Sequence, residues 1–530
     1  MRNILSSSIR KVNSLALLKS GLIFSFMTLI SRVLGLVRDM VIATFVGAGA
    51  NADVFLFANR IPNFLRRLFA EGAFAQAFVP VMTEVKEKHG DDEVRLLVSR
   101  VAGTLGVIVS LITVFAVIAS PLVVMIFGTG WFLDWVNDGP DAGKFELASV
   151  LLKMTFPYLF FITFVALAGA VLNTYNKFAV AAFTPVFLNI AIIACAILFR
   201  DSFAEPAYAL AMGVFVGGLI QFLFQLPFMA KAGLLVLPKW GWNDEYVKRI
   251  RLLMLPAILG VSVHQLNALV DTVIASFLQT GSISWLYFAD RLIEFPLGLF
   301  GIGIATVILP SLSKLHTQDD PKAFQSTMDW AVRFVLMLAF PAMVGLVALG
   351  PLIIEVLYLH GEFLPSDAQA VYWALVAYSS GLMSYMTVKV LAPGYFARQD
   401  TKSPVRIGII AMLSNVVFNF MLAPFYGYVG LAIATALSAT LNAYLLYRGL
   451  SQQGIYQLSK TTVVWVVKLI LSSAVMLAAL LYLYQNWPLA IEAFSDTLLQ
   501  LFGLIAVAII TYFATFTLLG FRLRQLKHAD

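Results

Sequence analysis

Long apolar runs dominate this sequence and constrain its fold more than any motif does. About fourteen runs of roughly 20 residues or more lie between polar, glycine or proline clusters. A helix of about 20 residues crosses the hydrocarbon core of a bilayer, and a spanning segment has to satisfy its own backbone hydrogen bonds. The runs therefore predict membrane-spanning helices at residues 20–46, 53–84, 96–127, 146–172, 180–199, 207–230, 250–278, 285–313, 325–350, 368–396, 405–424, 428–448, 461–484 and 496–520.

The composition also indicates a membrane protein. Of the 530 residues, 60% are hydrophobic and only 12% are charged, and the mean hydropathy is +0.87. Soluble domains have about 25% charged residues. Cys195 is the only cysteine, so no disulfide can form within the chain. The connecting loops are too short to hold a soluble catalytic domain, and we expect an all-α polytopic membrane protein that is not an enzyme.

Lysine and arginine are unevenly distributed between the loops. If the N-terminus is cytoplasmic, the loops on that side hold most of these residues, whereas the opposite loops add little beyond Lys144 and Arg200. Cytoplasmic loops of membrane proteins carry such an excess. We therefore expect both termini in the cytoplasm. The net charge of +7 then reflects topology and attraction to anionic lipids, not binding to nucleic acid.

An internal repeat divides the chain. The segment DMVIATF at Asp39–Phe45 matches DTVIASF at Asp271–Phe277. Farther along each half, FANRI at Phe57–Ile61 matches FADRL at Phe288–Leu292, so the order of the matches is the same in both halves. The matches predict two pseudo-symmetric six-helix lobes at residues 15–230 and 250–450, an interfacial linker at 231–249, and two additional helices within 461–520. Repeats of this kind are related by an axis along the membrane normal and enclose a central cavity.

Charges inside the early helices of each lobe are the candidate site. Residues 28–45 read TLISRVLGLVRDMVIATF, and a charge near the centre of a spanning helix costs at least about 2.5 kcal/mol. Such residues face the bundle interior or an aqueous cavity. The set comprises Arg32, Arg38, Asp39, Asp53, Arg60, Arg66, Arg67 and Glu71 in the first lobe and Asp271, Asp290, Arg291 and Glu294 in the second.

Some of these charges have a structural alternative. Arg67 lies one turn before Glu71, and the two are as consistent with a structural ion pair as with a functional one. Asp39 and Asp271 occupy matching repeat positions, where each is predicted to orient an arginine. Arg60 is also consistent with a side chain that reaches the interface. Even after pairing, a cationic surplus remains, and guanidinium groups bind phosphate oxygens bidentately.

A cation site is a weaker possibility. Asn415 and Asn419 are one helical turn apart, and with Asp271 and Thr435 they would supply oxygen ligands. Polar helix packing explains the same residues. We therefore predict no firm metal site.

Five segments resemble the MurJ (MviN) family of lipid II flippases, within the multidrug/oligosaccharidyl-lipid/polysaccharide exporter superfamily. The resemblance covers nearly the whole chain and rests on SRVLGLVRD, ADVFLFANRIPNFLRRLFAEGAFAQAFVPV, PAILGVSVHQLNALVDTVIASFL, WLYFADRLIEFPLGLFGIGIATVILPSLS and VLAPGYFARQDTKSPV. It implies fourteen helices in two lobes, with an extra C-terminal pair that forms a groove for a lipid tail.

The resemblance also implies a substrate, undecaprenyl-pyrophosphoryl disaccharide-pentapeptide, moved across the bacterial inner membrane by alternating access for peptidoglycan synthesis. It implies critical roles for Arg32, Arg38, Arg66 and Arg291 and an important one for Asp53. No cofactor is expected. The membrane potential or an ion gradient is the expected energy source, although Asn419 is neutral where a sodium-site carboxylate would be expected. The cell-wall synthesis machinery is a further possible partner.

Three other functions share part of this pattern. An exporter of another polyprenyl-linked oligosaccharide, or of drugs, would have the same fold, but a pocket for cationic drugs should be acidic. A membrane glycosyltransferase would need catalytic carboxylates on a substantial loop. A scaffold of the cell-wall machinery would tolerate neutral residues in place of the interior arginines.

Overall fold

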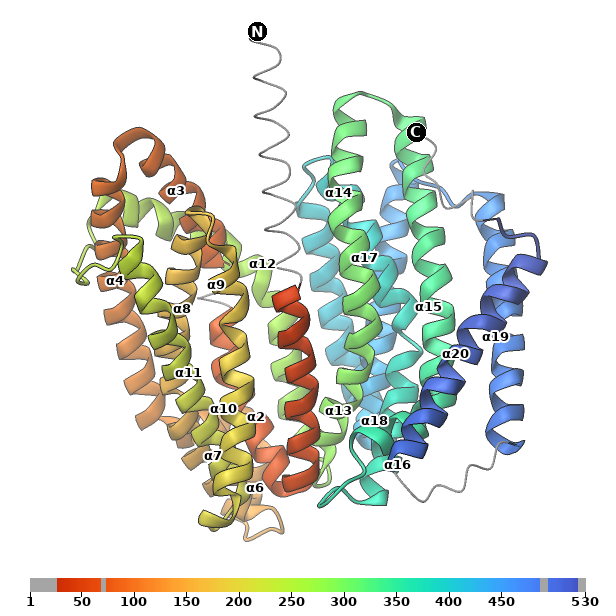
Figure 1. Ribbon diagram of the computed structural model, residues 1–530, viewed down its shortest axis with the longest axis horizontal. Helices are drawn as coiled ribbons and strands as arrows, with labels where there is room; N and C mark the ends of the chain where they lie inside the picture. Colours follow the sequence, from red (N-terminus) through yellow and green to blue (C-terminus); the bar gives the residue numbers. More distant parts are fainter. Residues whose placement is uncertain (1–25, 68–72, 487–493, 523–530) are drawn as a thin grey trace. The chain divides into compact units, whose positions relative to one another are not determined.

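The computed structural model describes residues 26–67, 73–486 and 494–522. Every regular element in these ranges is a helix, which confirms the all-α fold (Figure 1). Within the same ranges, nine helices are long and apolar enough to cross a membrane by length and composition. The chain folds into two compact units, Met1–Thr280 and Gly281–Asp530. This division is based on packing between residues and does not test the lobes predicted from the repeat, which therefore stay a prediction. Residues 15–25 of the first predicted lobe lie outside the described ranges.

The first unit begins with a helix at residues 26–46, which is followed by a row of helices joined by short turns. Helix α11 packs along both α8 and α10, and α12 packs on α3 (Figure 1). The labelled helices are α2 (Ala50–Arg66), α3 (Ala73–His89), α4 (Asp91–Ile118), α5 (Ser120–Phe127), α6 (Thr129–Val136), α7 (Ala142–Thr155), α8 (Pro157–Thr174), α9 (Phe178–Phe183), α10 (Pro185–Phe199), α11 (Pro206–Lys231) and α12 (Glu245–Ala275).

The second unit is organised around a long central helix, α15, which packs against α16, α17, α19 and α20. The C-terminal pair α19 and α20 shares an apolar core with α15, in which Leu469 and Tyr512 are fully buried. The helices are α13 (Ser282–Pro296), α14 (Ile302–Thr317), α15 (Pro321–Leu357), α16 (Pro365–Ser379), α17 (Leu382–Phe396), α18 (Lys402–Gln452), α19 (Lys460–Asn486) and α20 (Phe494–Leu518), with a π-helical turn at Leu297–Gly301 between α13 and α14.

Proline and glycine explain where predicted spans break. The span predicted at 146–172 is two helices, because Pro157 begins α8 and cannot donate the backbone hydrogen bond that would continue α7. Pro185 begins α10 in the same way. In α18 the backbone leaves helical geometry at a kink at Gly427, whose φ of 56° and ψ of −135° favour glycine. This break separates the spans predicted at 405–424 and 428–448.

The linker between α11 and α12 is tied to α4. The Lys239 backbone N–H donates to the Ser99 carbonyl oxygen at 2.9 Å, and the Ser99 hydroxyl donates to the Leu237 carbonyl oxygen at 2.6 Å. Trp240 and Trp242 stack in parallel on the exposed side, with ring centroids 6.0 Å apart. Indole rings beside lysines are typical of the headgroup region, so the observed geometry is compatible with the predicted interfacial segment.

The close approach of this linker requires glycine at position 103. A Cβ atom there would overlap the Lys239 carbonyl group, which belongs to the backbone and cannot rotate away. We expect Gly103→Ala to lower the stability of the purified protein by about 1–3 kcal/mol, the usual cost of overpacking, in thermal unfolding in detergent. The control is Gly408→Ala in α18, where no atom lies within 4 Å of the new Cβ. Equal melting temperatures for the two variants would contradict the prediction.

Candidate functional site

The first unit contains a half-open cavity of about 390 Å³. Its walls come from the helix of residues 26–46 and from α2, α3, α8, α9, α10 and α11. Small and apolar side chains of α8 form much of the wall, and polar groups converge from the other helices. The polar lining residues are Arg38, Arg66, Tyr158, Asn173, Thr184, Asn189, Gln221 and Gln225. A few polar groups in a mostly apolar concavity of this size are typical of a binding site.

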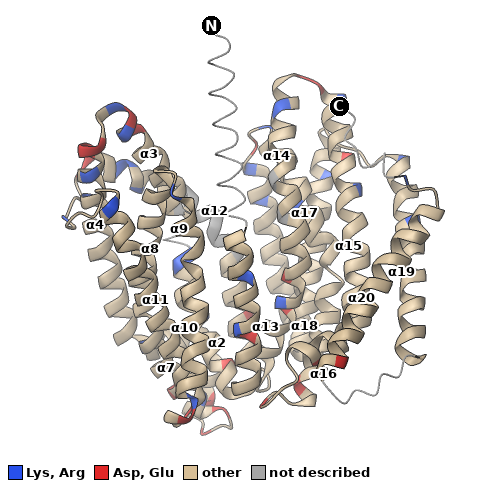
Figure 2. Cartoon of the chain, viewed as in Figure 1, with Lys and Arg blue, Asp and Glu red and all other residues tan. Residues whose placement is uncertain are grey.

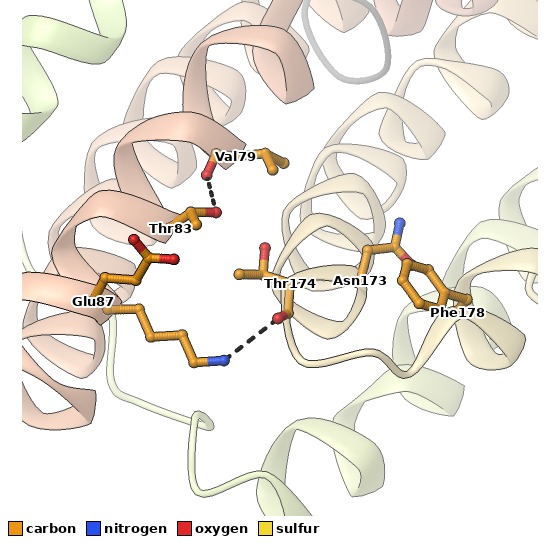
Figure 3. Close-up of a pocket in the computed structure, with 7 residues that line it drawn as sticks. Val79, Thr83, Glu87, Asn173, Thr174 and Phe178 are labelled. Carbon is orange, nitrogen blue, oxygen red and sulfur yellow. Dashed lines mark hydrogen bonds between the residues drawn. The ribbon is translucent and has the colours of Figure 1, made fainter. Parts of the chain in front are cut away.

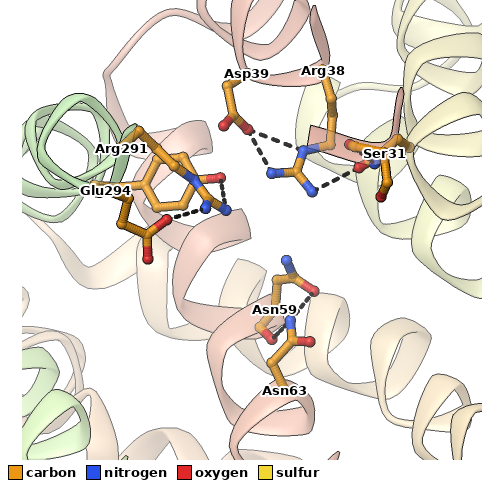
Figure 4. Close-up of polar contacts among 9 residues, drawn as sticks. Ser31, Arg38, Asp39, Asn59, Asn63, Arg291 and Glu294 are labelled. Carbon is orange, nitrogen blue, oxygen red and sulfur yellow. Dashed lines mark hydrogen bonds and ion pairs between the residues drawn. The ribbon is translucent and has the colours of Figure 1, made fainter. Parts of the chain in front are cut away.

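Arg38 is held in place by two partners (Figure 4). Its Nε and one terminal nitrogen donate to Asp39 Oδ1 at 3.0 and 2.7 Å, and its other terminal nitrogen donates to Asn189 Oδ1 at 3.1 Å. The Asn189 amide in turn donates to the Ser31 carbonyl oxygen at 3.2 Å. Only 12% of the Arg38 side chain and 3% of the Asp39 side chain are exposed. A charge this deeply buried needs such partners, and Asp39 lies where it can orient Arg38.

Arg66 reaches the same cavity from the last turn of α2. Its Nε donates to Asn63 Oδ1 at 3.0 Å, and the Asn63 amide donates to the Asn59 carbonyl oxygen at 2.8 Å. A cation in the last turn is favoured because the carbonyl ends of the helix dipoles point toward it. Arg32 lies on the same helix as Arg38 but is exposed, and it does not line this cavity. The structure thus brings two of the predicted arginines into one cavity.

Sequence reasoning missed the amide side chains of this site. Gln221 and Gln225 lie one turn apart on α11 and are 2% and 1% exposed. Asn189 is also buried, on α10. The sequence feature that could have identified the glutamines is their polarity within the apolar span of residues 207–230. Two glutamines at helical spacing in such a span face a neighbouring helix or a cavity, not lipid.

A second cavity, of about 450 Å³, adjoins the first and shares Val79 and Asn173 with it. Figure 3 shows α3 side chains facing the end of α8 across this space. The Lys86 ammonium donates to the Thr174 carbonyl oxygen at 3.4 Å and lies 3.7 Å from the centre of the Tyr175 ring. Burial raises the pKa of the Tyr175 hydroxyl, and the Asp91 carboxylate that accepts its hydrogen bond raises it further, so this tyrosine stays neutral.

Asp53 does not line either cavity. It is 2% exposed, and its carboxylate lies 4.0 Å from the ammonium of Lys144, which is 5% exposed. That ammonium also contacts Asp141 at 2.9 Å and Thr280 Oγ1 at 2.7 Å. The cluster joins α2 and α7 to the end of the first unit. This geometry favours a stabilising role for Asp53.

The other charges of α2 have neutral partners among the described residues. Arg60 donates to Thr272 Oγ1 at 2.7 Å, on α12. Arg67 donates to Gln265 Oε1 at 3.4 Å. Glu71, its predicted ion-pair partner, lies outside the described residues. The pairing of Arg67 with Glu71 therefore stays a prediction.

In the second unit, Arg291 contacts two residues of its own helix, α13 (Figure 4). Its guanidinium donates to Glu294 Oε2 at 2.7 Å and to the Tyr287 hydroxyl at 3.2 Å. Its side chain is 35% exposed, which leaves much of it open to a ligand or solvent. Asp290 precedes it and is exposed. Arg291 and Glu294, three residues apart on one helix, thus form an ion pair at a spacing that brings side chains together.

The residues of the weaker cation site partly converge. Asn419 donates to Asn415 Oδ1 at 2.9 Å, and Asn415 donates to Thr435 Oγ1 at 3.4 Å, all within the second unit. Asp271 lies in the first unit. Within the described ranges, no three histidine, cysteine or acidic side chains are grouped as metal ligands. The contacts among the three second-unit residues are those expected of polar helix packing.

Comparisons with known proteins extend over most of the chain. The family model described as lipid II flippase MurJ matches residues 42–502. A protein named probable lipid II flippase MurJ from Vibrio cholerae is 60% identical over 514 residues, covering 97% of this chain and 98% of that protein. The corresponding protein of Haemophilus influenzae is 56% identical and covers 94% of this chain and 99% of its own length.

Solved structures agree. A chain described as lipid II flippase MurJ in an inward closed conformation superposes with a TM-score of 0.78 at 28% identity, covering 94% of this chain and 98% of that one. An inward-facing multidrug resistance transporter of the MATE family, in the MOP superfamily, gives a TM-score of 0.68 at 12% identity, with 82% and 97% covered. The second likeness shows a shared fold alone. The extent of the family match and the close relatives confirm the resemblance seen in the sequence: this chain belongs to the MurJ family.

Proposed function

We propose that this protein is a lipid II flippase, which moves the lipid-linked peptidoglycan precursor from the cytoplasmic to the periplasmic leaflet by alternating access and makes or breaks no bond. Membership in a family described by that activity supports the proposal. The observation that carries it is the pair of arginines, Arg38 and Arg66, in one largely apolar cavity of the first unit. A lipid carrying a pyrophosphate needs this combination of fixed cations and apolar walls.

The chemistry of the arginines fits a pyrophosphate. A guanidinium presents five N–H donors in a planar fork, so one arginine keeps a carboxylate partner while it binds phosphate oxygens bidentately. In the proposal Arg32, Arg38, Arg66 and Arg291 bind the pyrophosphate in turn or together. Asp39 and Glu294 fix the orientation of Arg38 and Arg291, because each lies within 2.7 Å of its arginine.

The orientation in the membrane is part of the proposal. Lysine and arginine gather at the α3–α4 end of the first unit (Figure 2), where the positive-inside rule places the cytoplasm. Both termini are then cytoplasmic and the protein lies in the bacterial inner membrane. The apolar groups of α15, α19 and α20 offer the polyprenyl tail a surface. The energy source is the membrane potential or an ion gradient, and the cell-wall synthesis machinery is the expected protein partner.

The proposal is tested by measuring how much lipid II is accessible in the outer leaflet of cells depleted of their own flippase. A wild-type copy of this protein should restore accessible lipid II, and a copy with Arg66→Ala should not. Arg448→Ala, an exposed arginine at the end of α18, is the matched control and should behave as wild type. If the wild-type copy inserts in the membrane and leaves lipid II inaccessible, the proposed function is wrong.

A further inference from the structure

We infer that Gln221 and Gln225 form a carbohydrate subsite, which accepts hydrogen bonds from the sugar attached to the pyrophosphate; this inference rests on the proposed function and deepens it. Both side chains line the 390 Å³ cavity that also contains Arg38 and Arg66. Both are more than nine-tenths buried. The carbonyl oxygen of each, Oε1, is buried and has no hydrogen-bond donor among the described residues.

Thr184 fixes which way the two amides point. The Gln221 amide nitrogen donates to the Thr184 carbonyl oxygen at 3.1 Å, and a carbonyl only accepts. The Gln225 amide nitrogen lies 2.9 Å from Thr184 Oγ1, whose own hydrogen is donated to the Val180 carbonyl oxygen at 2.8 Å. In this arrangement the hydroxyl accepts from Gln225. Rotating the Gln221 amide by 180° would put two acceptors together, and rotating the Gln225 amide would take the Thr184 hydrogen away from the Val180 carbonyl oxygen. In the arrangement that keeps all three hydrogen bonds, each Oε1 is the atom that needs a donor.

These two acceptors point to a ligand. A buried polar atom that lacks a hydrogen-bond partner destabilises the folded protein, and two such oxygen atoms lie one turn apart in the same cavity wall. The Asn173 side-chain oxygen, on α8 at the rim shared with the second cavity, is a third such acceptor. Three acceptors around one space are complementary to a molecule rich in hydroxyl or amide N–H groups.

The position of Arg38 indicates that the sugar, and not the peptide, occupies the space beside Gln221 and Gln225. Arg38 lines the same cavity, and in lipid II the sugar is bonded directly to the pyrophosphate, whereas the peptide begins farther away. A phosphate on Arg38 therefore brings sugar hydroxyl and acetamido N–H groups to Gln221 and Gln225 first. The cavity volume lies within the range of about 300–1,000 Å³ for small-ligand sites. The adjoining cavity, with Lys86 and Glu87 in its wall, offers space for the rest of the headgroup.

Binding of four synthetic lipids to the purified full-length protein in nanodiscs tests the inference. The lipids are undecaprenol, undecaprenyl pyrophosphate, undecaprenyl pyrophosphate with the disaccharide but without peptide, and complete lipid II. Gln221→Met and Gln225→Met keep the length of the side chain and remove the acceptor. We expect each variant to bind the disaccharide lipid about 5- to 10-fold more weakly, the usual effect of one hydrogen bond, and undecaprenyl pyrophosphate as tightly as wild type does.

Two further variants separate recognition from packing. Gln500→Met, on α20 in the second unit, removes another buried glutamine whose Oε1 has no donor within the described ranges. It should change the binding of neither undecaprenyl pyrophosphate nor the disaccharide lipid. Ala166→Leu fills space in the cavity wall, and Ala166 takes no part in the Thr184 hydrogen bonds. The variant should weaken binding of the disaccharide lipid more than binding of undecaprenyl pyrophosphate, even where a glutamine variant fails to fold.

The outcomes are distinct. Unchanged affinity for the disaccharide lipid in both glutamine variants and in Ala166→Leu would mean that only water satisfies these acceptors, and would overturn the inference. An equal loss for the lipids with and without sugar would overturn it as well, because the glutamines would then support the pyrophosphate site or the fold. An effect seen only with complete lipid II would assign the cavity to the peptide and overturn the sugar subsite. Failure of the wild-type protein to prefer undecaprenyl pyrophosphate over undecaprenol would instead contradict the proposed function.

Discussion

Replacing Arg38 by alanine is expected to abolish growth of a flippase-depleted strain that depends on this protein. The substitution removes a guanidinium from the cavity and also leaves the buried Asp39 carboxylate without its arginine. Removing one partner of a buried ion pair costs about 3–5 kcal/mol, so stability falls together with binding. Colony formation after depletion measures the effect, with the amount of protein in the membrane fraction measured in parallel.

Arg38→Lys separates the two contributions. Lysine keeps the positive charge beside Asp39, but it has no planar fork to hold Asp39 and Asn189 while binding phosphate. We therefore expect Arg38→Lys to insert normally and still fail to support growth. Normal growth with either variant present at wild-type levels would remove Arg38 from the substrate site.

Replacing Lys144 by methionine is expected to give a large loss of stability. The Lys144 ammonium is buried with Asp53 and contacts Asp141 and Thr280. Methionine leaves the Asp53 carboxylate buried without this cation, at a cost of about 3–5 kcal/mol. Thermal unfolding of the purified protein in detergent measures the loss directly.

The double variant Asp53→Asn/Lys144→Met tests what Asp53 does. It removes both buried charges, so we expect most of the stability lost in Lys144→Met to return. If Asp53 supports the fold, growth in the depleted strain should return with stability. A stable double variant that cannot sustain growth would instead place Asp53 in contact with the substrate, as the family resemblance implies.

The sequence was sufficient to predict that the chain lies in a membrane, that its fold is all-α and which family it belongs to. Apolar runs long enough to span a bilayer leave a chain few alternatives to helices, because no water is available there to satisfy an open backbone. The breaks within the spans were harder to place: Pro157 and Pro185 each divide a predicted run, while Gly427 leaves two predicted spans joined in one kinked helix.

The candidate arginines could also be identified from the sequence, since a charge within an apolar run is costly and has to be compensated. Their hydrogen-bond partners could be predicted only in part. The pairing of Arg291 with Glu294 follows from helical spacing, and Asp39 is adjacent to Arg38 in the chain. Asn189, by contrast, lies 151 positions from Arg38, and no periodicity predicts a contact between two separate helices.

The sequence by itself therefore determined that this protein is helical, crosses a membrane and carries arginines within its apolar runs. Only the tertiary structure decided that Arg38 and Arg66 share a cavity with Gln221 and Gln225, and that Asp53 faces Lys144 and lies outside that cavity. The physical reason is that hydrophobic periodicity tells which side of a helix avoids lipid, whereas the neighbours of that side depend on how the helices pack.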